Sequence, residues 1–247
     1  MSIVSAKALT SEPTAIVWDL DGCTQLDGIL KYSRQMEVSV DILDPSIEQY
    51  LQSLLPSRDE VLTEMEQIAQ RKGFPIIGPL VGRLLFQLAR LTEAKNIFEL
   101  GSGYGYSALW FSKGIDPGGR IISTDGSNEN AVAAQDFFRR AGVLSQIDFR
   151  VGDALTILDE EPGPFDIILN DIDKHQYPQA FEKAIAKLRQ GGILITDNVL
   201  WKGRVVSGDS DASTAGIQRF NELAYQSSGI LSTLIPLRDG VMITLKL

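Results

Sequence analysis

Cysteine and histidine are nearly absent from this sequence of 247 residues, which contains one of each. A single cysteine excludes an intramolecular disulfide and any zinc site that needs several cysteine ligands. A single histidine excludes a multi-histidine metal cluster, and every Ser-His or Cys-His triad would have to use His175. Hydrolase triads are therefore disfavoured, and the metal site that this chain can build has oxygen ligands only.

Long apolar runs and an excess of positive charge are also missing. No uninterrupted apolar segment reaches the roughly 18 residues of a membrane-spanning helix. The first residues, M-S-I-V-S-A-K-A-L-T, lack the apolar core of a signal peptide, so we expect a cytoplasmic protein. Lys and Arg total 23 against 32 Asp and Glu, and ten of these acids but only four bases lie in residues 1–60. No basic stripe favours nucleic-acid binding.

The remaining composition, 44% hydrophobic and 22% charged, is that of a globular protein. Residues 1–43 show no sustained periodicity, and we interpret them as an N-terminal arm ahead of a domain that spans 44–247. Apolar residues then recur with helical spacing, which predicts a helical lead-in. The expected helices of this lead-in are 46–55, 58–71 and 79–92.

After residue 95, short apolar runs alternate with helical periods, as in a doubly wound α/β sheet. The predicted strands are 96–100, 120–125, 146–151, 165–170, 193–197, 231–236 and 241–246. The predicted helices are 105–114, 128–141, 177–189 and 213–227, and Gly191-Gly192 is expected to cap the third of them. Runs such as F-D-I-I-L are apolar throughout, as in strands covered on both faces. The last two strands, joined by R-D-G, are expected to form an antiparallel hairpin.

Three features that follow successive strands predict a nucleotide-like ligand. The first strand runs into the loop Glu99–Ser107, E-L-G-S-G-Y-G-Y-S, whose glycines allow a sharp turn close to a ligand. Asp125 ends the second strand, where a carboxylate can accept both ribose hydroxyls. Gly152-Asp153-Ala154 follows the third strand and could line an adenine. The loop lacks the G-x-G-x-x-G spacing for a pyrophosphate, so S-adenosylmethionine fits better than a dinucleotide. The glycine loop alone could be only a tight turn.

Acidic and amide side chains follow the fourth and fifth predicted strands. Asp171 ends one strand, and Asp197 with Asn198 ends the next. Because adjacent parallel strands lie about 5 Å apart, these three side chains are expected to converge beside the methyl donor. Their oxygens suit Mg²⁺, Mn²⁺ or Ca²⁺ and leave positions for water or two substrate oxygens. Helix capping and turn formation are the alternative roles of such strand-end residues.

A divalent metal suits methyl transfer because the acceptor must attack the sulfonium as an oxyanion. A phenol with a pKa near 10 is mostly protonated at neutral pH, and coordination to a cation lowers such a pKa. Lys174 would take the proton if burial depressed its own pKa. The competing interpretation of Lys174 is a surface charge. The neighbouring His175 is expected to be a spectator.

Together these motifs resemble the cation-dependent O-methyltransferases typified by caffeoyl-CoA and catechol O-methyltransferases. The resemblance covers about residues 46–247 and rests on E-L-G-S-G-Y-G-Y-S, S-T-D-G, I-D-F-R-V-G-D-A-L, D-I-D-K and D-N-V-L-W-K-G. It implies a Rossmann-like sheet of seven strands with an antiparallel last strand, usually in a homodimer. It also implies that the acceptor is a small catechol-like or vicinal-diol molecule.

The resemblance assigns roles to individual residues of this chain. The residues expected at the methyl donor are Glu99, Gly101, Ser102, Ser107, Asp125, Ala154 and Asp173, with Gly103 and Asp153 in the same loops. Asp171, Asp197 and Asn198 would hold the metal, Asp171 and Lys174 would be catalytic, and Trp201 and Lys202 would face the acceptor.

This sequence departs from the family pattern at three positions. Lys202 stands where plant members commonly have Asn, and His175 stands where they have an acidic or amide residue. A Thr or Ser that contacts the donor is replaced near Ile77. A neighbouring subgroup with similar sequence motifs methylates 5-hydroxyuridine in tRNA. If this chain acted on such a substrate, Lys202 and Arg204 could contact a phosphate or carboxylate. Transfer RNA is therefore an alternative acceptor. A catalytically silent module that binds S-adenosylmethionine is the alternative from another functional class.

A second motif lies in the N-terminal arm. Residues 15–24, A-I-V-W-D-L-D-G-C-T, resemble the first motif of haloacid-dehalogenase-type phosphatases. Such phosphatases need a sheet domain of their own to supply a lysine and further acids, whereas here the helical lead-in begins at residue 46. We therefore expect no phosphatase, and interpret the arm as a dimer contact or a cover for the substrate cleft.

Overall fold

The computed structural model describes residues 42–208 and 210–247, all within one compact unit, Val38–Leu247. The predicted arm, apart from residues 42 and 43, and the whole D-x-D-G-C-T stretch lie outside the described residues. None of the helices in the described part is long and apolar enough to span a bilayer.

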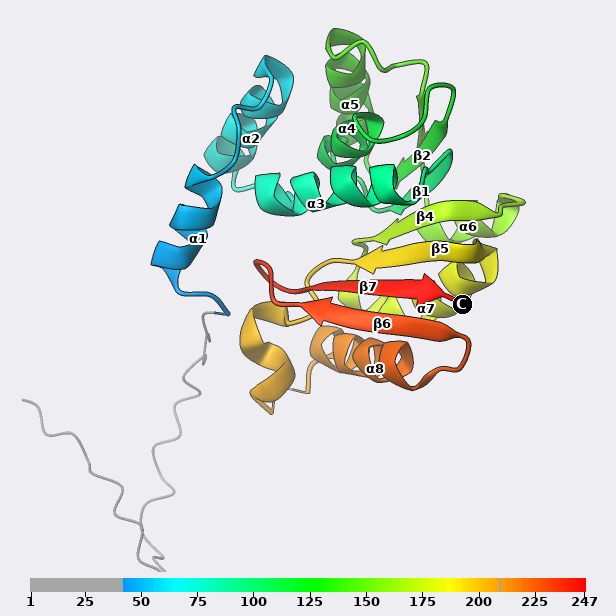
Figure 1. Ribbon diagram of the computed structural model, residues 1–247. Coiled ribbons are helices and arrows are strands. Elements are labelled where there is room, and N and C mark those ends of the chain that lie inside the picture. Colours follow the sequence, from blue (N-terminus) through cyan, green and yellow to red (C-terminus); the bar gives the residue numbers. More distant parts are fainter. Residues whose placement is uncertain (1–41, 209) are drawn as a thin grey trace, which may run out of the picture. The chain divides into compact units, whose positions relative to one another are not determined.

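Helices and strands alternate along the described chain (Figure 1). The helices are α1 (Pro45–Ser53), α2 (Glu60–Lys72), α3 (Gly78–Leu91), α4 (Tyr106–Ser112), α5 (Asn128–Arg140), α6 (Ala154–Glu160), α7 (Tyr177–Lys187) and α8 (Ala212–Gln226). The strands are β1 (Asn96–Leu100), β2 (Arg120–Asp125), β3 (Ile147–Val151), β4 (Phe165–Asn170), β5 (Leu188–Thr196), β6 (Ile230–Ile235) and β7 (Val241–Lys246). Two short 3₁₀ turns are η1 (Lys174–Gln176) and η2 (Trp201–Val206).

The seven strands form one sheet in the order β3-β2-β1-β4-β5-β7-β6. Strands β1 to β5 pair in parallel, whereas β7 lies antiparallel to both β5 and β6. The predicted fold is confirmed: a Rossmann-like doubly wound sheet of seven strands whose last strand is reversed. Because β1 and β4 are neighbours and lead outward in opposite directions, a ligand crevice is expected beyond their carboxyl ends.

Alternate residues of each central strand pack on opposite faces of the sheet. Ile97 of β1 and Ile167 of β4 lie in one apolar core, which includes buried residues of α3, α4 and α5. Phe98 and Ile168, the next residues, lie in a second core with α6, α7 and α8. Figure 1 shows the two groups of helices on either side of the sheet. Burial on both faces explains why these strands are continuous apolar runs.

One helix was missed, and one local prediction was wrong. The segment Ala154–Glu160 forms helix α6, which begins where the Asp153 side chain accepts a hydrogen bond from the Thr156 amide. Gly191-Gly192 does not cap a helix: α7 ends at Lys187, and β5 already begins at Leu188. A Cβ on Gly192 would stand 2.9 Å from the Arg189 carbonyl and 3.1 Å from that of Phe165. The two glycines therefore allow close strand approach within an irregular stretch of the β4–β5 pairing.

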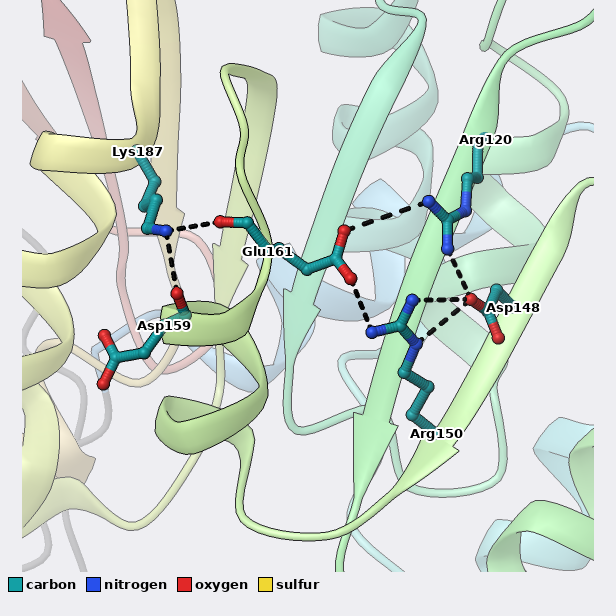
Figure 2. A network of polar contacts seen from close by, with 6 residues as sticks. All are labelled: Arg120, Asp148, Arg150, Asp159, Glu161 and Lys187. Carbon is teal, nitrogen blue, oxygen red and sulfur yellow. Dashed lines mark hydrogen bonds and ion pairs between the residues drawn. The ribbon is translucent and has the colours of Figure 1, made fainter.

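A network of ion pairs connects β2 and β3 with the segment after α6 (Figure 2). Glu161, just after α6, contacts Arg150 of β3 at 2.6 Å and Arg120 of β2 at 3.9 Å. Both arginines also contact Asp148, at 3.0 and 2.6 Å. Lys187 donates to the carbonyl oxygens of Asp159 and Glu161 from the far side. The network ties α6 and the loop before β4 to β2, β3 and α7.

Candidate active site

A cleft of about 1680 Å³ opens beyond the carboxyl ends of β1 to β5. Every predicted site residue lines this cleft except Glu99, which lies beneath it. We call the part formed by the loops after β1, β2 and β3 and by α2 the β1–β3 half. The part formed by the loops after β4 and β5 and by the β6–β7 turn is the β4–β5 half. His175 and Arg204 do not line the cleft.

The glycine loop joins the two halves. Gly101 has a φ of 83°, and a Cβ there would stand 2.6 Å from the carbonyl oxygen of Asp171. No other residue type combines this left-handed backbone with so close an approach. The Asp171 amide in turn donates to the Leu100 carbonyl at 2.9 Å. The loop after β1 and the loop after β4 are therefore packed directly against each other.

Glu99 supports the glycine loop from below. It is completely buried and accepts hydrogen bonds from the hydroxyls of Ser102 at 2.5 Å and Ser123 at 2.6 Å. Burial raises the pKa of this carboxyl, partly countered by the serine hydrogen bonds. Its Oε1 is buried and, among the described residues, has no hydrogen-bond partner. Glu99 can thus accept a bond from a ligand while it holds the loop that carries Ser102.

The ends of β2 and β3 present two carboxylates to the same half of the cleft. Asp125 accepts hydrogen bonds at Oδ1 from the Ser127 amide and the Asn130 side chain, at 2.8 and 2.9 Å. No described residue bonds to its Oδ2, which leaves one oxygen for a ligand. Asp153 lines the cleft and caps α6, and its bonds to Thr156 lower its pKa. Ala154 follows on the cleft wall.

Asp171 and Asp197 follow directly on Asn170 and Thr196, which are paired across β4 and β5. Burial and the negative charge of Asp171 raise the pKa of Asp197 to about 7. The pKa of Asp171 is also raised by burial, against the opposing effect of the Lys174 ammonium. The two carboxylates therefore lie close together with incompletely compensated charge, as the strand-end pattern predicts.

The donor set of this pair fits a hard divalent cation. Asp197 is 3% exposed, and its Oδ1 is buried with no hydrogen-bond partner among the described residues. Asn198, which lines the cleft beside it, has a left-handed backbone with a φ of 57°. Within residues 42–208 and 210–247, no group of three or more His, Cys, Asp or Glu side chains is arranged to hold a metal ion. A metal here would have two carboxylates and one amide as its protein ligands.

Lys174 occupies a well-defined position beside Asp171. Its Nζ lies 2.7 Å from Asp171 Oδ1 and 3.2 Å from the Ile172 carbonyl. The same ammonium lies 5.1 Å from the centre of the Tyr177 ring and 5.9 Å from that of Trp201. The side chain is 12% exposed. Lys174 is thus a nearly buried cation held by a carboxylate and two aromatic faces.

Helix α8 supports the turn that carries Lys174. A Cβ on Gly216 would collide with the carbonyl oxygen of Lys174 and stand 2.8 Å from the Cα of His175. Tyr177 is fully buried, packs edge-on against Phe220 of α8, and donates a hydrogen bond of 2.9 Å to the Asp197 carbonyl. One helix therefore positions both the lysine turn and the backbone between Asp197 and Asn198.

The β6–β7 turn contributes two residues that sequence reasoning missed, Arg238 and Asp239. Arg238 donates to the carbonyls of Ile76 and Ile77, before α3, and so joins that segment to the hairpin. Burial raises the pKa of Asp239, which accepts a hydrogen bond of 2.5 Å from the Lys202 amide. The sequence signal was a pair of opposite charges in a turn next to a strand, which we interpreted only as a hairpin connection.

Trp201 and Lys202 form the rim of the β4–β5 half. Both have left-handed backbones, with φ values of 49° and 52°. The Trp201 ring is partly buried, its Nε1 has no hydrogen-bond partner among the described residues, and Arg204 lies 5.7 Å from its centre. Lys202 is exposed. Three left-handed residues that are not glycine, Asn198, Trp201 and Lys202, fall within five positions, and such strain is concentrated at functional sites.

Comparison with known proteins gives a consistent picture. Residues 53–247 match the family model described as O-methyltransferase. A catechol O-methyltransferase of Niastella koreensis is 34% identical over 197 residues, which cover 77% of this chain and 89% of that relative. The family match, residues 53–247, includes every described cleft residue that follows α1.

Solved structures share the fold over most of the chain. The O-methyltransferase TomG of Streptomyces achromogenes, in complex with SAM, is 32% identical with a TM-score of 0.75, and the match covers 81% of this chain and 96% of that one. The O-methyltransferase of Bacillus cereus, in complex with SAH, is 30% identical with a TM-score of 0.75 over 82% of this chain and 97% of that one.

Proposed function

This chain belongs to the O-methyltransferase family and is an S-adenosylmethionine-dependent O-methyltransferase; on that premise we propose a divalent-metal-dependent enzyme that methylates a small catechol-like or vicinal-diol acceptor. The observation that carries the proposal is the direct contact between the glycine loop and the Asp171 loop. It brings a donor cleft and a pair of oxygen ligands to one point, as an in-line displacement requires.

The β1–β3 half binds the methyl donor in this proposal. Asp125, with Oδ2 available, accepts the ribose hydroxyls, and Gly152 to Ala154 border the adenine. Glu99 holds Ser102 and offers its unpartnered Oε1, while Gly101 and Gly103 let the backbone approach the ligand. Ser107 and Asp173 line the same cleft. S-adenosylmethionine supplies the electrophilic methyl group.

The β4–β5 half activates the acceptor. Asp171, Asp197 and Asn198 would hold Mg²⁺, with Mn²⁺ or Ca²⁺ as alternatives, and the bound cation would stabilise the acceptor as an oxyanion. Asp197 is buried and Asp171 partly buried, and both have raised pKa values, which favours a cation that neutralises them. Asn198 would add a neutral oxygen, and positions would remain for water and for two oxygens of the acceptor.

Lys174 would receive the acceptor proton. Its Nζ lies 2.7 Å from Asp171 Oδ1, and one proton of Nζ would first pass to solvent so that the neutral amine can accept the proton of the acceptor hydroxyl. Tyr177 and Trp201 keep the ammonium at the edge of the diol site. Asp171 therefore has two functions, as a metal ligand and as the partner that fixes Lys174.

A small diol is the acceptor class that the relatives support. The Niastella koreensis relative is named for catechol, and a Medicago sativa relative with 29% identity over 206 residues is named for caffeoyl-CoA. Catechol and the caffeoyl group each carry a vicinal diol on an aromatic ring. Trp201, partly buried at the rim with a free indole N–H, offers a flat surface for such a ring.

The decisive test is methyl transfer from labelled S-adenosylmethionine to a panel of catechols, hydroxycinnamates and hydroxyuridine-containing tRNA, with Mg²⁺ and with EDTA. We expect methylation of diols that is abolished by EDTA and restored by excess Mg²⁺. Undiminished transfer in EDTA would exclude the metal mechanism. Methylation of tRNA alone would replace the small acceptor, and donor binding without any turnover would identify a silent module.

We also propose that the enzyme is a cytoplasmic homodimer. Helix α1 has no buried residue, and Ile47, Tyr50 and the C-cap residue Leu54 are exposed by 50%, 61% and 61%. Apolar side chains in a row on one helix favour burial against another surface. Light scattering of the full chain at micromolar concentration should give twice the mass of 27.1 kDa.

A further inference from the structure

The positive side chains that line the described cleft all lie in one of its two halves. Glu66, Asp125 and Asp153 line the β1–β3 half, which has no lysine or arginine among its described lining residues. All three cations that line the described cleft, Lys174, Lys202 and Arg238, belong to the β4–β5 half. A donor with a sulfonium suits the first half, and an acceptor with negative charge suits the second.

Two of these three cations are already engaged. Lys174 forms its ion pair with Asp171 at 2.7 Å. Arg238 donates to the carbonyls of Ile76 and Ile77 and so holds the segment before α3. Neither side chain can bind a substituent of the acceptor without breaking a contact that shapes the cleft.

Lys202 is the remaining cation. Among the described residues, no carboxylate oxygen forms an ion pair with its Nζ, and the side chain is exposed. Its backbone is nevertheless fixed, because the Lys202 amide donates to Asp239 Oδ1 at 2.5 Å and the residue has a φ of 52°. A flexible cationic side chain therefore starts from a rigid, strained position on the cleft rim, four residues beyond Asn198.

The opposing charges nearby do not cancel this cation. The carboxylates that line the same half are Asp171, Asp173, Asp197 and Asp239. Two of them, Asp171 and Asp197, are the proposed metal ligands, and a divalent cation bound there would make this half net positive. Asp239 Oδ1 accepts a hydrogen bond from the Lys202 amide. The Asp239 carboxylate attracts the Lys202 ammonium without forming an ion pair with it, so the exposed ammonium stays available for an anion that enters with the acceptor.

We propose that Lys202 selects acceptors that carry a carboxylate on the side of the ring away from the diol. A carboxylate is favoured over a phosphate because one lysine supplies one positive charge. Among the described residues that line this half there is no second unengaged cation, since Arg238 is held by the carbonyls of Ile76 and Ile77. This inference rests on the proposed diol methyltransferase and adds the charge of its substrate. No bond changes at Lys202, which acts by binding alone.

The test compares 3,4-dihydroxybenzoate with 3,4-dihydroxybenzamide, which keeps the diol and the shape but is neutral. We expect the wild type to favour the acid in kcat/KM by about fivefold, the size of a partly exposed charge contact. Lys202→Met should abolish the preference by lowering kcat/KM for the acid alone. Lys202→Glu should reverse it. Calorimetric titration of each acceptor in the presence of SAH and Mg²⁺ should give the same ratios for binding.

Lys72→Met is the matched control, because Lys72 is an exposed lysine at the end of α2 that does not line the cleft. It removes the same charge and should leave the acid preference unchanged. Equal rates on acid and amide by the wild type would overturn the inference while the amide's methylation upheld the diol methyltransferase. A preference that survives in Lys202→Met would also overturn it. If neither diol is methylated, the acceptor class fails and this inference fails with it.

Discussion

The two halves of the cleft are built in different ways. The β1–β3 half takes its ligand-facing groups from single strand-to-helix connections, and the hydrogen bonds that orient Asp125 are short-range, from Ser127 and Asn130. The β4–β5 half is assembled from segments far apart in the chain: η1, the end of β5, the β6–β7 turn and α8.

This difference bears on the two tasks of the proposed mechanism. Donor binding would depend mainly on loops that follow single strands. Acceptor activation would require that Asp171, Lys174, Asp197 and Asn198 be aligned with one another, which depends on supports such as Tyr177 and Gly216. Substitutions in the β4–β5 half should therefore reduce kcat and leave the affinity for the methyl donor unchanged.

The largest effect is expected from Asp197→Ala. Loss of a proposed metal ligand should lower kcat more than about 100-fold, the upper end for residues that only support a ligand. Affinity for SAH, measured by calorimetry, should stay within about twofold. Asp125→Ala is the reciprocal variant and should weaken SAH binding while Mg²⁺ binding is retained. If both variants lose both affinities, the two halves are not independent.

Asp197→Asn should lower activity but stabilise the folded protein when no metal is bound. The pKa of Asp197 is raised to about 7 in the folded protein, so the folded state holds this proton more tightly than the unfolded chain. The contribution of Asp197 is therefore most favourable below about pH 4 and is lost as the pH rises through 7. Asparagine does not titrate, so without metal the variant should gain about 2–3 kcal/mol over wild type between pH 5 and pH 8.

Urea unfolding in EDTA at the two pH values measures this gain. Excess Mg²⁺ should reduce it, because the metal neutralises Asp197 in the wild type and binds the variant weakly. A stability difference that does not change with pH would mean that Asp197 is ionised without cost in the folded protein.

Gly216→Ala tests the support that α8 gives to Lys174. The added Cβ has to push the Lys174–His175 backbone away, and displacement of a reacting group by about 1 Å costs up to 100-fold. We expect kcat to fall roughly 10- to 100-fold with donor KM unchanged.

Gly82→Ala is the control for this variant, since a Cβ there would collide with the Trp110 ring between α3 and α4. It should destabilise the fold by a similar amount, about 1–3 kcal/mol. Any kinetic effect should appear in donor KM, because α4 follows the glycine loop. Equal kcat losses in the two variants would show that Gly216 acts only through stability.

The smallest effect is expected from Tyr177→Phe. The variant keeps the ring beneath Lys174 and removes only the hydroxyl that donates to the Asp197 carbonyl at 2.9 Å. One hydrogen bond is worth about 1 kcal/mol, so Mg²⁺ affinity should fall about fivefold, with kcat restored at saturating Mg²⁺. Calorimetry of Mg²⁺ binding provides the readout, and a kcat that stays low would assign the hydroxyl a role beyond the metal ligand.

The sequence predicted the parts of the molecule that depend on strand ends. Because every parallel strand ends at the same edge, Asp125, Asp171 and Asp197 could be brought to one cleft from their positions alone. The reversed last strand followed from two β-rich runs around a short turn. Helix α6 was missed since seven residues, A-L-T-I-L-D-E, are too few to show a helical period.

The supports of the β4–β5 half could not be predicted in the same way. Gly216 lies in the middle of a helix, where sequence indicates only a weak helix former, and its contact with Lys174 spans 42 positions of chain. Arg238 reaches Ile76 and Ile77 across still longer separations. Such contacts depend on how the helices pack against the sheet, and no local sequence pattern determines that packing.

The ion pairs of Arg120, Asp148, Arg150 and Glu161 bear on how readily this enzyme can evolve. They tie β2 and β3 to the segment after α6, away from the rim of the cleft that carries Lys202. Substitutions of the exposed Lys202 side chain leave these ties untouched, so their stability cost should stay local. An enzyme of this kind should be able to exchange one acceptor for another at this position and still fold.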